Sequence, residues 1–201
     1  MARYTGPRTK KSRRYGVPLF GPHKALERRN YPPGMHGDKG RRKQSEYATA
    51  LGEKQKLRIM YGLLERQFRR YYEIALQRRG ITGETLLQLL ETRLDNIVFR
   101  LGFANSRRAA RQMVGHGHIS VNGKRVTIPS YRVRKGDEVT LKSATRENFL
   151  VRRNMDTLER QTPAWLQTGD NGFSVAVLNP PERVHIDEPV QEQLIVELYS
   201  K

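Results

Sequence analysis

Apolar residues recur at helical spacing through the middle of the chain. Between Leu94 and Leu101 the apolar positions fall three and four residues apart, which predicts a helix with one buried face. Gly102 follows in the position that commonly ends a helix. Ser106 can then cap a second short helix, which buries small residues such as Ala110 and displays arginines. The pattern predicts two short helices joined by a tight loop.

An alternating pattern follows the second helix. Apolar residues alternate at 119–121 and again at 126–128, on either side of Asn122-Gly123. Asn-Gly between alternating segments is the strongest short-range signal for a two-residue hairpin turn. We therefore expect a β-hairpin whose second strand runs through 128 and ends at Pro129.

The flanking regions add further predicted elements. Ser45 can cap a helix that runs to about Arg79 with an aromatic core face, and a further helix opens at Thr82. Beyond Gly136 the pattern predicts a strand at 139–141, a helix within 143–162 and a strand at 173–177. Trp165 is expected to pack under the resulting sheet.

Charge changes the picture more than any other bulk property. The 201 residues include 38 Lys and Arg against 20 acids, which gives a formal net charge of +18. Such an excess indicates a polyanionic partner, with nucleic acid favoured over an anionic membrane. The absence of cysteine excludes disulfides, thiolate nucleophiles and cysteine metal sites. No run of apolar residues is long enough to span a membrane, and we expect no secretory signal.

The charge is distributed unevenly along the chain. Residues 1–45 carry 13 cations and 2 acids, with many Gly and Pro, so we expect an extended arm that orders on a polyanion. Residues 91–155 carry 14 cations and 5 acids, whereas 156–201 carry 3 cations and 8 acids. A disordered basic tail and an ordinary solvated helix face are the alternative interpretations of the two basic regions.

Sequence motifs for catalysis or metal binding are weak or absent. No phosphate-binding Walker loop and no Gly-x-Ser-x-Gly elbow occur. His116 and His118 would share one face of a strand, but two ligands make a weak metal site. We therefore predict no cofactor, no metal and no enzymatic activity.

Several motifs of the central region occur in an order typical of one family. They are Arg93-Leu94-Asp95, Ser106-Arg107, Ala110-Arg111-Gln112, His116-Gly117-His118-Ile119, Val121-Asn122-Gly123 and Pro129-Ser130-Tyr131. Together they resemble the small RNA-binding fold named after the fourth ribosomal protein of the small subunit. The basic arm, the stretch GEKQKLRIMYGLLERQFRRYY and the closing Leu198-Tyr199-Ser200-Lys201 extend the resemblance to the bacterial type of that family, in a cysteine-free variant.

The resemblance implies an α+β fold with three parts. These are a basic extended N-terminal arm, a helical domain, and an inserted helix-helix-hairpin RNA-binding module extended by an antiparallel sheet. We expect the arm at 1–44, the helical domain at 45–90 joined by 184–201, and the module at 91–183 with its core at 91–155.

The resemblance also implies a function. It predicts a structural constituent of the small ribosomal subunit in the cytoplasm, a primary binder of 16S ribosomal RNA that nucleates assembly of the 5′ domain and contributes to translational accuracy. The implied protein partners are small-subunit ribosomal protein five, by contact, and protein twelve, by function. We expect a monomer within the subunit, with no membrane and no small-molecule substrate.

Two other function classes stay open. Arg93-Leu94-Asp95 resembles the segment around the catalytic aspartate of pseudouridine synthases, some of which carry the same RNA-binding fold. Here Asp95 lies within the first helix of the module, so we expect it to pair with Arg93, Arg100 or a neighbouring cation, or to hold the helix against the hairpin. A general basic binder of nucleic acids is the third class.

Arginine forks grip phosphate bidentately, and aromatic rings can stack on bases. We expect Arg93 and Arg100 to share a polar stripe on the first helix. The predicted RNA-binding residues, from all three parts of the chain, are Arg3, Tyr4, Lys10, Lys11, Arg13, Arg14, Lys54, Lys56, Arg66, Arg69, Arg70, Arg93, Arg100, Ser106, Arg107, Arg108, Arg111, Gln112, His116, His118, Asn122, Gly123, Lys124, Arg125, Tyr131 and Arg132.

Overall fold

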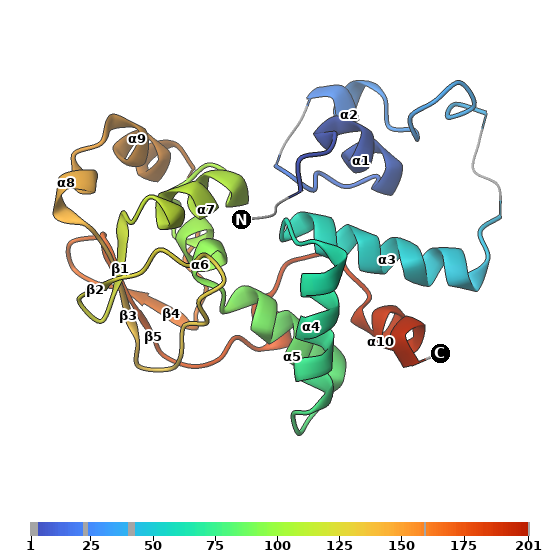
Figure 1. Ribbon diagram of the computed structural model, residues 1–201. Coiled ribbons are helices and arrows are strands. Elements are labelled where there is room, and N and C mark those ends of the chain that lie inside the picture. The colour runs from blue at the N-terminus through green and yellow to red at the C-terminus, as the bar shows by residue number, and fades with distance from the viewer. Residues whose placement is uncertain (1–3, 22–23, 40–42, 159, 201) are drawn as a thin grey trace. The chain divides into compact units, whose positions relative to one another are not determined.

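The chain folds into two compact units, each with its own elements (Figure 1). The computed structural model describes residues 4–21, 24–39, 43–158 and 160–200. Unit 1 comprises Met1–Gly83 and Glu188–Lys201, and unit 2 comprises Glu84–Asp187. Helices and an antiparallel sheet occur together, which confirms the α+β class.

A five-stranded antiparallel sheet forms the centre of unit 2, in the order β2-β1-β3-β5-β4. Its strands are β1 (Ile119–Val121), β2 (Lys124–Arg125), β3 (Glu138–Leu141), β4 (Leu166–Thr168) and β5 (Ser174–Val177). The predicted strands at 139–141 and 173–177 are confirmed, whereas the sequence did not reveal β4. Alternate residues of β3 and β5 are buried, as expected for a sheet with one face on a core.

Helices cover the sheet of unit 2 (Figure 1). They are α6 (Leu94–Arg100), α7 (Arg107–Gly115), α8 (Ser143–Arg146) and α9 (Phe149–Leu158), and a short 3-10 helix η1 follows at Arg183–His185. Leu94, Ile97 and Ala110 join residues of the sheet in one apolar core, and Trp165, at 2% exposure, packs there as predicted.

Turn chemistry explains how α6, α7 and the hairpin are joined. Gly102 has φ +77°, the left-handed conformation that ends a helix most easily in glycine. The Ser106 side chain accepts a hydrogen bond from Ala109 N at 3.3 Å, so its predicted role as N-cap is confirmed. Asn122 and Gly123 both have positive φ, 50° and 75°, as a type I′ hairpin turn requires.

The predicted second hairpin strand is shorter than expected. The strand ends at Arg125 with one further hydrogen bond from Val126 N to Ile119 O, and Ile128, predicted as a strand residue, is 54% exposed. The chain leaves the sheet because carbonyl groups of the following residues bind the first turn of α6. Pro129 O accepts a hydrogen bond from Asp95 N, and Tyr131 O accepts one from Leu94 N. These bonds satisfy N–H groups that the first turn of a helix leaves unpaired.

Unit 1 is helical in the residues described. Its helices are α1 (Arg8–Tyr15), α2 (Lys24–Arg28), α3 (Glu46–Met60), α4 (Glu65–Leu76) and α10 (Glu192–Ser200), and α5 (Thr82–Glu91) begins in it. The single helix predicted from Ser45 to Arg79 is wrong, because the chain turns at Gly62, which has φ +66°. The turn gives two helices whose apolar faces can both be buried, and α10, which the sequence did not reveal, packs on α3.

The arm differs from the extended chain that its composition predicted. Pro7 precedes α1 and Gly16 ends it in a left-handed conformation. The Arg13 guanidinium lies over the Tyr31 ring at 4.8 Å and donates to Tyr31 O at 3.1 Å. Cation–aromatic stacking and carbonyl contacts therefore order basic residues that have little apolar surface to bury.

None of the helices in the described residues is both long and apolar enough to cross a membrane.

Candidate nucleic-acid interface

Two buried carboxylates organise the arginines around α6. Asp95 accepts from Arg93 Nε at 2.9 Å and Nη2 at 2.6 Å, and Arg111 Nη1 lies 3.5 Å from the same carboxylate. The Arg93 side chain is only 1% exposed. The predicted pairing of Asp95 with a neighbouring cation is confirmed. The predicted polar stripe of Arg93 and Arg100 is wrong, because Arg93 precedes α6 and turns into the core.

Glu91 is the second buried carboxylate, and the side chains of Arg100 and Asn96 bind it. Arg100 grips it with two hydrogen bonds, Nε to Oε2 at 3.1 Å and Nη2 to Oε1 at 2.9 Å. The amide of Asn96 donates to the same carboxylate at 2.8 Å and accepts from Arg107 Nε at 2.8 Å. The sequence reasoning missed Glu91, although its position nine residues before Arg100 is visible in the sequence.

Arg160 joins this region from a distant part of the chain. It donates to the backbone oxygens of Phe99, Ala104 and Asn105. Burial, followed by the positive charges of Arg107 and Arg100, lowers the pKa of Arg160. The sequence reasoning placed Arg160 in an acidic tail, and only the fold brings it to the end of α6.

The region carries more positive than negative charge. Among the described residues, five guanidinium groups, from Arg93, Arg100, Arg107, Arg111 and Arg160, lie around the buried carboxylates of Asp95 and Glu91, and Arg100 also lies 3.9 Å from the exposed Asp187. Like charges held this close raise the local positive potential, and a polyanion relieves their repulsion. The arrangement can therefore bind anions.

Apart from the buried Arg93, the predicted residues of this unit lie between positions 100 and 132 and differ in exposure. The exposed ones are Arg108, Gln112, His116, Asn122, Gly123, Lys124, Arg125 and Arg132. The half-buried ones are Arg100, Ser106, Arg107, Arg111, His118 and Tyr131. α7 and the β1–β2 hairpin follow one another in the chain, and both carry exposed cationic or polar residues.

Internal bonds account for some of these side chains. The Asn122 amide donates to Asp137 Oδ1 at 2.8 Å and accepts from Glu138 N at 2.8 Å, so it ties the turn to the start of β3. Arg125 donates to His116 O at 3.2 Å and lies across Gly117. These bonds fix the direction in which the hairpin displays Lys124 and Arg125.

The two histidines do not make a metal site. Their ring centroids lie 6.0 Å apart, and His118 Nδ1 is 2.9 Å from Thr145 Oγ1. Among the residues that the structure describes, no cluster of three or more His, Cys, Asp or Glu could hold a metal ion. His118 thus has a hydrogen-bonding partner within the unit and His116 is exposed, and their contact with RNA stays a prediction.

Lys54 and Lys56, predicted from the helical unit, turn toward carboxylates. Lys54 is buried and lies 2.6 Å from Glu65 Oε1, while Lys56 lies 2.7 Å from Glu53 Oε1. Arg66, Arg69 and Arg70 are exposed on α4, and Arg69 pairs with Glu73 along that helix. The three exposed arginines of α4 are thus accessible, and the two lysines are engaged internally.

The predicted residues of the arm are also distributed between surface and interior. Arg3 lies outside the described residues. Lys10 and Arg14 are exposed, whereas Tyr4, Lys11 and Arg13 are half-buried. The Tyr4 ring stacks on Phe20 with centroids 6.2 Å apart. This aromatic residue therefore has an intramolecular stacking partner, and its contact with RNA stays a prediction.

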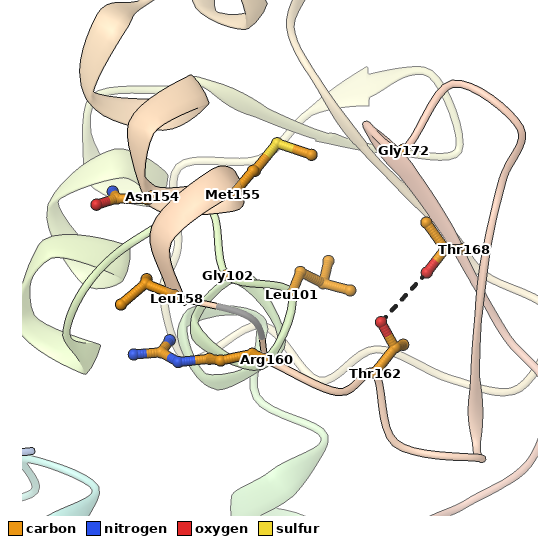
Figure 2. Close-up of a pocket in the computed structure, with 9 residues that line it drawn as sticks. All are labelled: Leu101, Gly102, Asn154, Met155, Leu158, Arg160, Thr162, Thr168 and Gly172. Atoms are coloured by element: carbon orange, nitrogen blue, oxygen red, sulfur yellow. Dashed lines mark hydrogen bonds between the residues drawn. The ribbon is translucent and has the colours of Figure 1, made fainter.

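A small cavity lies at the end of α9 (Figure 2). Its volume is about 190 Å³. The lining residues are Leu101, Gly102, Asn154, Met155, Leu158, Arg160, Thr162, Thr168 and Gly172. Among the described residues that line it, the polar side chains are those of Asn154, Arg160, Thr162 and Thr168.

Comparison with known proteins agrees with this geometry. Residues 3–91 match the model of the ribosomal protein S4/S9 N-terminal domain, and residues 92–139 match the S4 domain. The chain is 55% identical to small ribosomal subunit protein uS4 of Opitutus terrae over 202 residues, covering 100% of both chains. It is 56% and 57% identical to the proteins of the same name from Saccharopolyspora erythraea and Nocardioides sp., again over 100% of each chain.

Proposed function

Because the chain belongs to the uS4 family of small ribosomal subunit proteins, we propose that it is a structural, non-enzymatic component of that subunit that binds ribosomal RNA. Every relative named above is a ribosomal protein and none is an RNA-modifying enzyme. In this role it contributes to assembly of the subunit and to accurate translation, as the family does.

One observation carries the proposal that α7 and the hairpin form the RNA-binding surface. Among the described residues around α6, five guanidinium groups lie near the carboxylates of Asp95, Glu91 and Asp187, and exposed cations occur on both α7 and the hairpin. Phosphate groups neutralise such cations, and each contact releases condensed counterions. RNA helices are recognised mainly through shape, phosphate and the 2′-hydroxyl, for which this cationic surface is suited.

We assign the direct contacts first to the exposed residues of this surface, above all Arg108, Lys124, Arg125 and Arg132. Arg107 and Arg111 are half-buried and hold their side chains against Asn96 and Asp95. These two arginines contribute positive charge to the surface, and the accessible edges of their guanidinium groups contact phosphate. Arg93 is buried and supports the surface from within.

A salt titration tests this surface. Arg108→Ala combined with Lys124→Ala should weaken binding to ribosomal RNA and lower the slope of log affinity against log salt by up to about 2 units, one for each lost phosphate contact. The matched control removes two exposed cations elsewhere, Arg78→Ala with Arg79→Ala. Equal slopes for the two double variants would assign the effect to net charge and overturn the surface.

The protein neighbours belong to the same proposal. We propose that the chain contacts small-subunit ribosomal protein five and acts with protein twelve in translational accuracy, and the support is membership of the family. Cross-linking in reconstituted subunits tests the contact. Reconstituted particles that give no cross-link to protein five would refute it.

A further inference from the structure

Arg160 occupies an unusual position for a surface arginine. It lies beyond the matched S4 domain of residues 92–139, in the loop after α9. Its side chain extends beneath Leu158, away from the threonines across the cavity (Figure 2). Nη1 donates to Ala104 O at 3.0 Å and also to Phe99 O, and Nη2 donates to Asn105 O at 3.1 Å. One guanidinium group thus connects the end of α6 to the loop that precedes α7.

The same guanidinium shares an aromatic ring with an arginine of the proposed RNA surface. Arg160 Cζ lies 3.9 Å from the centroid of the Phe99 ring, and Arg107 Cζ lies 4.6 Å from it. Arg107 is the first residue of α7 and is also held by Asn96 at 2.8 Å. The Phe99 ring therefore couples the orientation of Arg107 to that of Arg160.

Holding three neighbouring carbonyls does not by itself account for a cation at this place. The positive charges of Arg107 and Arg100 act on Arg160, and carboxylates of Glu91 and Asp187 lie beside Arg100. An anion bound beside Arg107 and Arg160 lowers the repulsion between these two cations. A planar guanidinium can hold the carbonyls, stack on Phe99 and keep its charge, whereas an ammonium group cannot do all three.

We propose that Arg160 is a positioning residue for RNA binding, which presents Arg107 and the first turn of α7 to phosphate. The proposal rests on the proposed function, because it assumes that α7 meets RNA. Residues outside the S4 domain thereby take part in setting the geometry of its binding surface.

A double-mutant cycle in the full chain tests the coupling, with a ribosomal RNA fragment of the body of the small subunit as the probe. Arg160→Gln should weaken binding on the order of ten-fold, the size typical of coupled neighbours. Arg107→Gln should then weaken binding much less in the Arg160→Gln background than in the wild type. Additive effects of the two substitutions would overturn the proposal.

Arg160→Lys distinguishes position from charge. Lysine keeps the charge but cannot bridge the carbonyls and stack on the ring, so we expect it to bind nearly as weakly as Arg160→Gln. Full rescue by lysine would mean that charge alone matters and would overturn positioning. Urea unfolding, followed by Trp165 fluorescence, identifies conditions under which all variants are folded. If Arg160→Gln does not fold, Arg160→Lys replaces it in the double-mutant cycle.

Failure of this proposal can be told from failure of the proposed surface. If Arg108→Ala with Lys124→Ala lowers the salt slope while Arg160→Gln binds as the wild type does, only the role of Arg160 is refuted. If the Arg108 and Lys124 pair has no effect on the slope, the surface itself is refuted.

Discussion

At the scale of single residues, carboxylates decide whether the arginines around α6 are buried or exposed. Arg93 is 1% exposed and depends on Asp95 for its compensating charge, whereas Arg108 on the following helix is exposed. Two arginines in one basic stretch therefore have opposite roles, one in the core and one at the surface. Without its partner carboxylate, a guanidinium this deeply buried would be strongly destabilising.

Replacing Asp95 should be costly. Asp95→Asn removes the charge that compensates Arg93 and Arg111, so we expect the free energy of unfolding to fall by about 3 kcal/mol, as for other broken buried ion pairs. Urea titration with Trp165 fluorescence measures it. Asp170→Asn, at an exposed position, serves as control and should change stability by no more than about 0.5 kcal/mol. Equal effects at the two sites would contradict the structural role of the pair.

At the scale of elements, a polar network joins three helices of unit 1. Glu65 at the start of α4 accepts from Lys54 of α3 at 2.6 Å and from the Tyr199 hydroxyl of α10 at 2.9 Å. The Tyr199 ring stacks on Tyr72 with centroids 4.5 Å apart. Burial, together with the Glu65 carboxylate, raises the pKa of Tyr199, so this hydroxyl stays protonated as a donor at physiological pH. The network attaches a helix from the end of the chain to two helices from its first half.

This network predicts a pH dependence of stability. Burial alone raises the pKa of Glu65, but the bonds from Lys54 and Tyr199 outweigh it and hold the pKa below the ordinary 4.5. A lowered pKa stabilises the fold above about pH 4.5, and this contribution is lost as pH falls through the folded-state value. We expect Glu65→Gln to be less stable than the wild type at neutral pH, with the two converging at acidic pH, once the pH has fallen below the lowered pKa of Glu65.

Urea unfolding of both proteins across this range measures the convergence. The control is Glu73→Gln, which removes a carboxylate from an exposed pair on α4 and should alter stability little at any pH. A constant difference between the wild type and Glu65→Gln from neutral to acidic pH would contradict the assignment.

Two neighbouring glycines of the α7–β1 connection should respond oppositely to alanine. Gly117 has φ +76°, and a Cβ there would lie 2.0 Å from Arg125 Nε. Gly117→Ala should therefore destabilise the protein by about 1–2 kcal/mol, mainly through backbone strain, and displace Arg125. Gly115→Ala meets nothing within 4 Å in α7 and should be neutral or stabilising. Thermal unfolding compares them, and equal melting temperatures would refute the conformational requirement at 117.

At the scale of the whole molecule, charge is segregated along the chain. The arm and the central region carry most of the net +18, whereas the last quarter of the chain is acidic. Arg160 is an exception, because the fold moves this cation from the acidic segment to the basic surface. Affinity for RNA should accordingly fall steeply as salt rises.

That the rest of the chain folds without the arm stays a prediction, and deleting residues 1–44 tests it. The two units contain most of their buried apolar residues beyond position 44, so the truncated protein should fold and bind ribosomal RNA more weakly, with a smaller salt slope. Circular dichroism and filter binding measure the two properties. Loss of helical signal from the remaining residues would show that the arm belongs to the folded unit.

The sequence by itself determined the local elements and the chemical character of the protein. The apolar period of α6, the Ser106 cap, the Asn122-Gly123 turn and the excess of cations all act over a few residues or over bulk composition, so they could be predicted without the fold. The order of family motifs in the chain pointed to the correct family for the same reason.

Only the tertiary structure decided which charges face inward. The break at Gly62, the short second hairpin strand, the burial of Arg93 and the arrival of Arg160 at Phe99 all depend on partners far along the chain or on the competition for buried hydrogen bonds. The local sequence of a basic stretch does not distinguish an arginine that pairs with a buried carboxylate from one that faces solvent. The packing of distant segments determines which carboxylate, if any, lies beside each arginine.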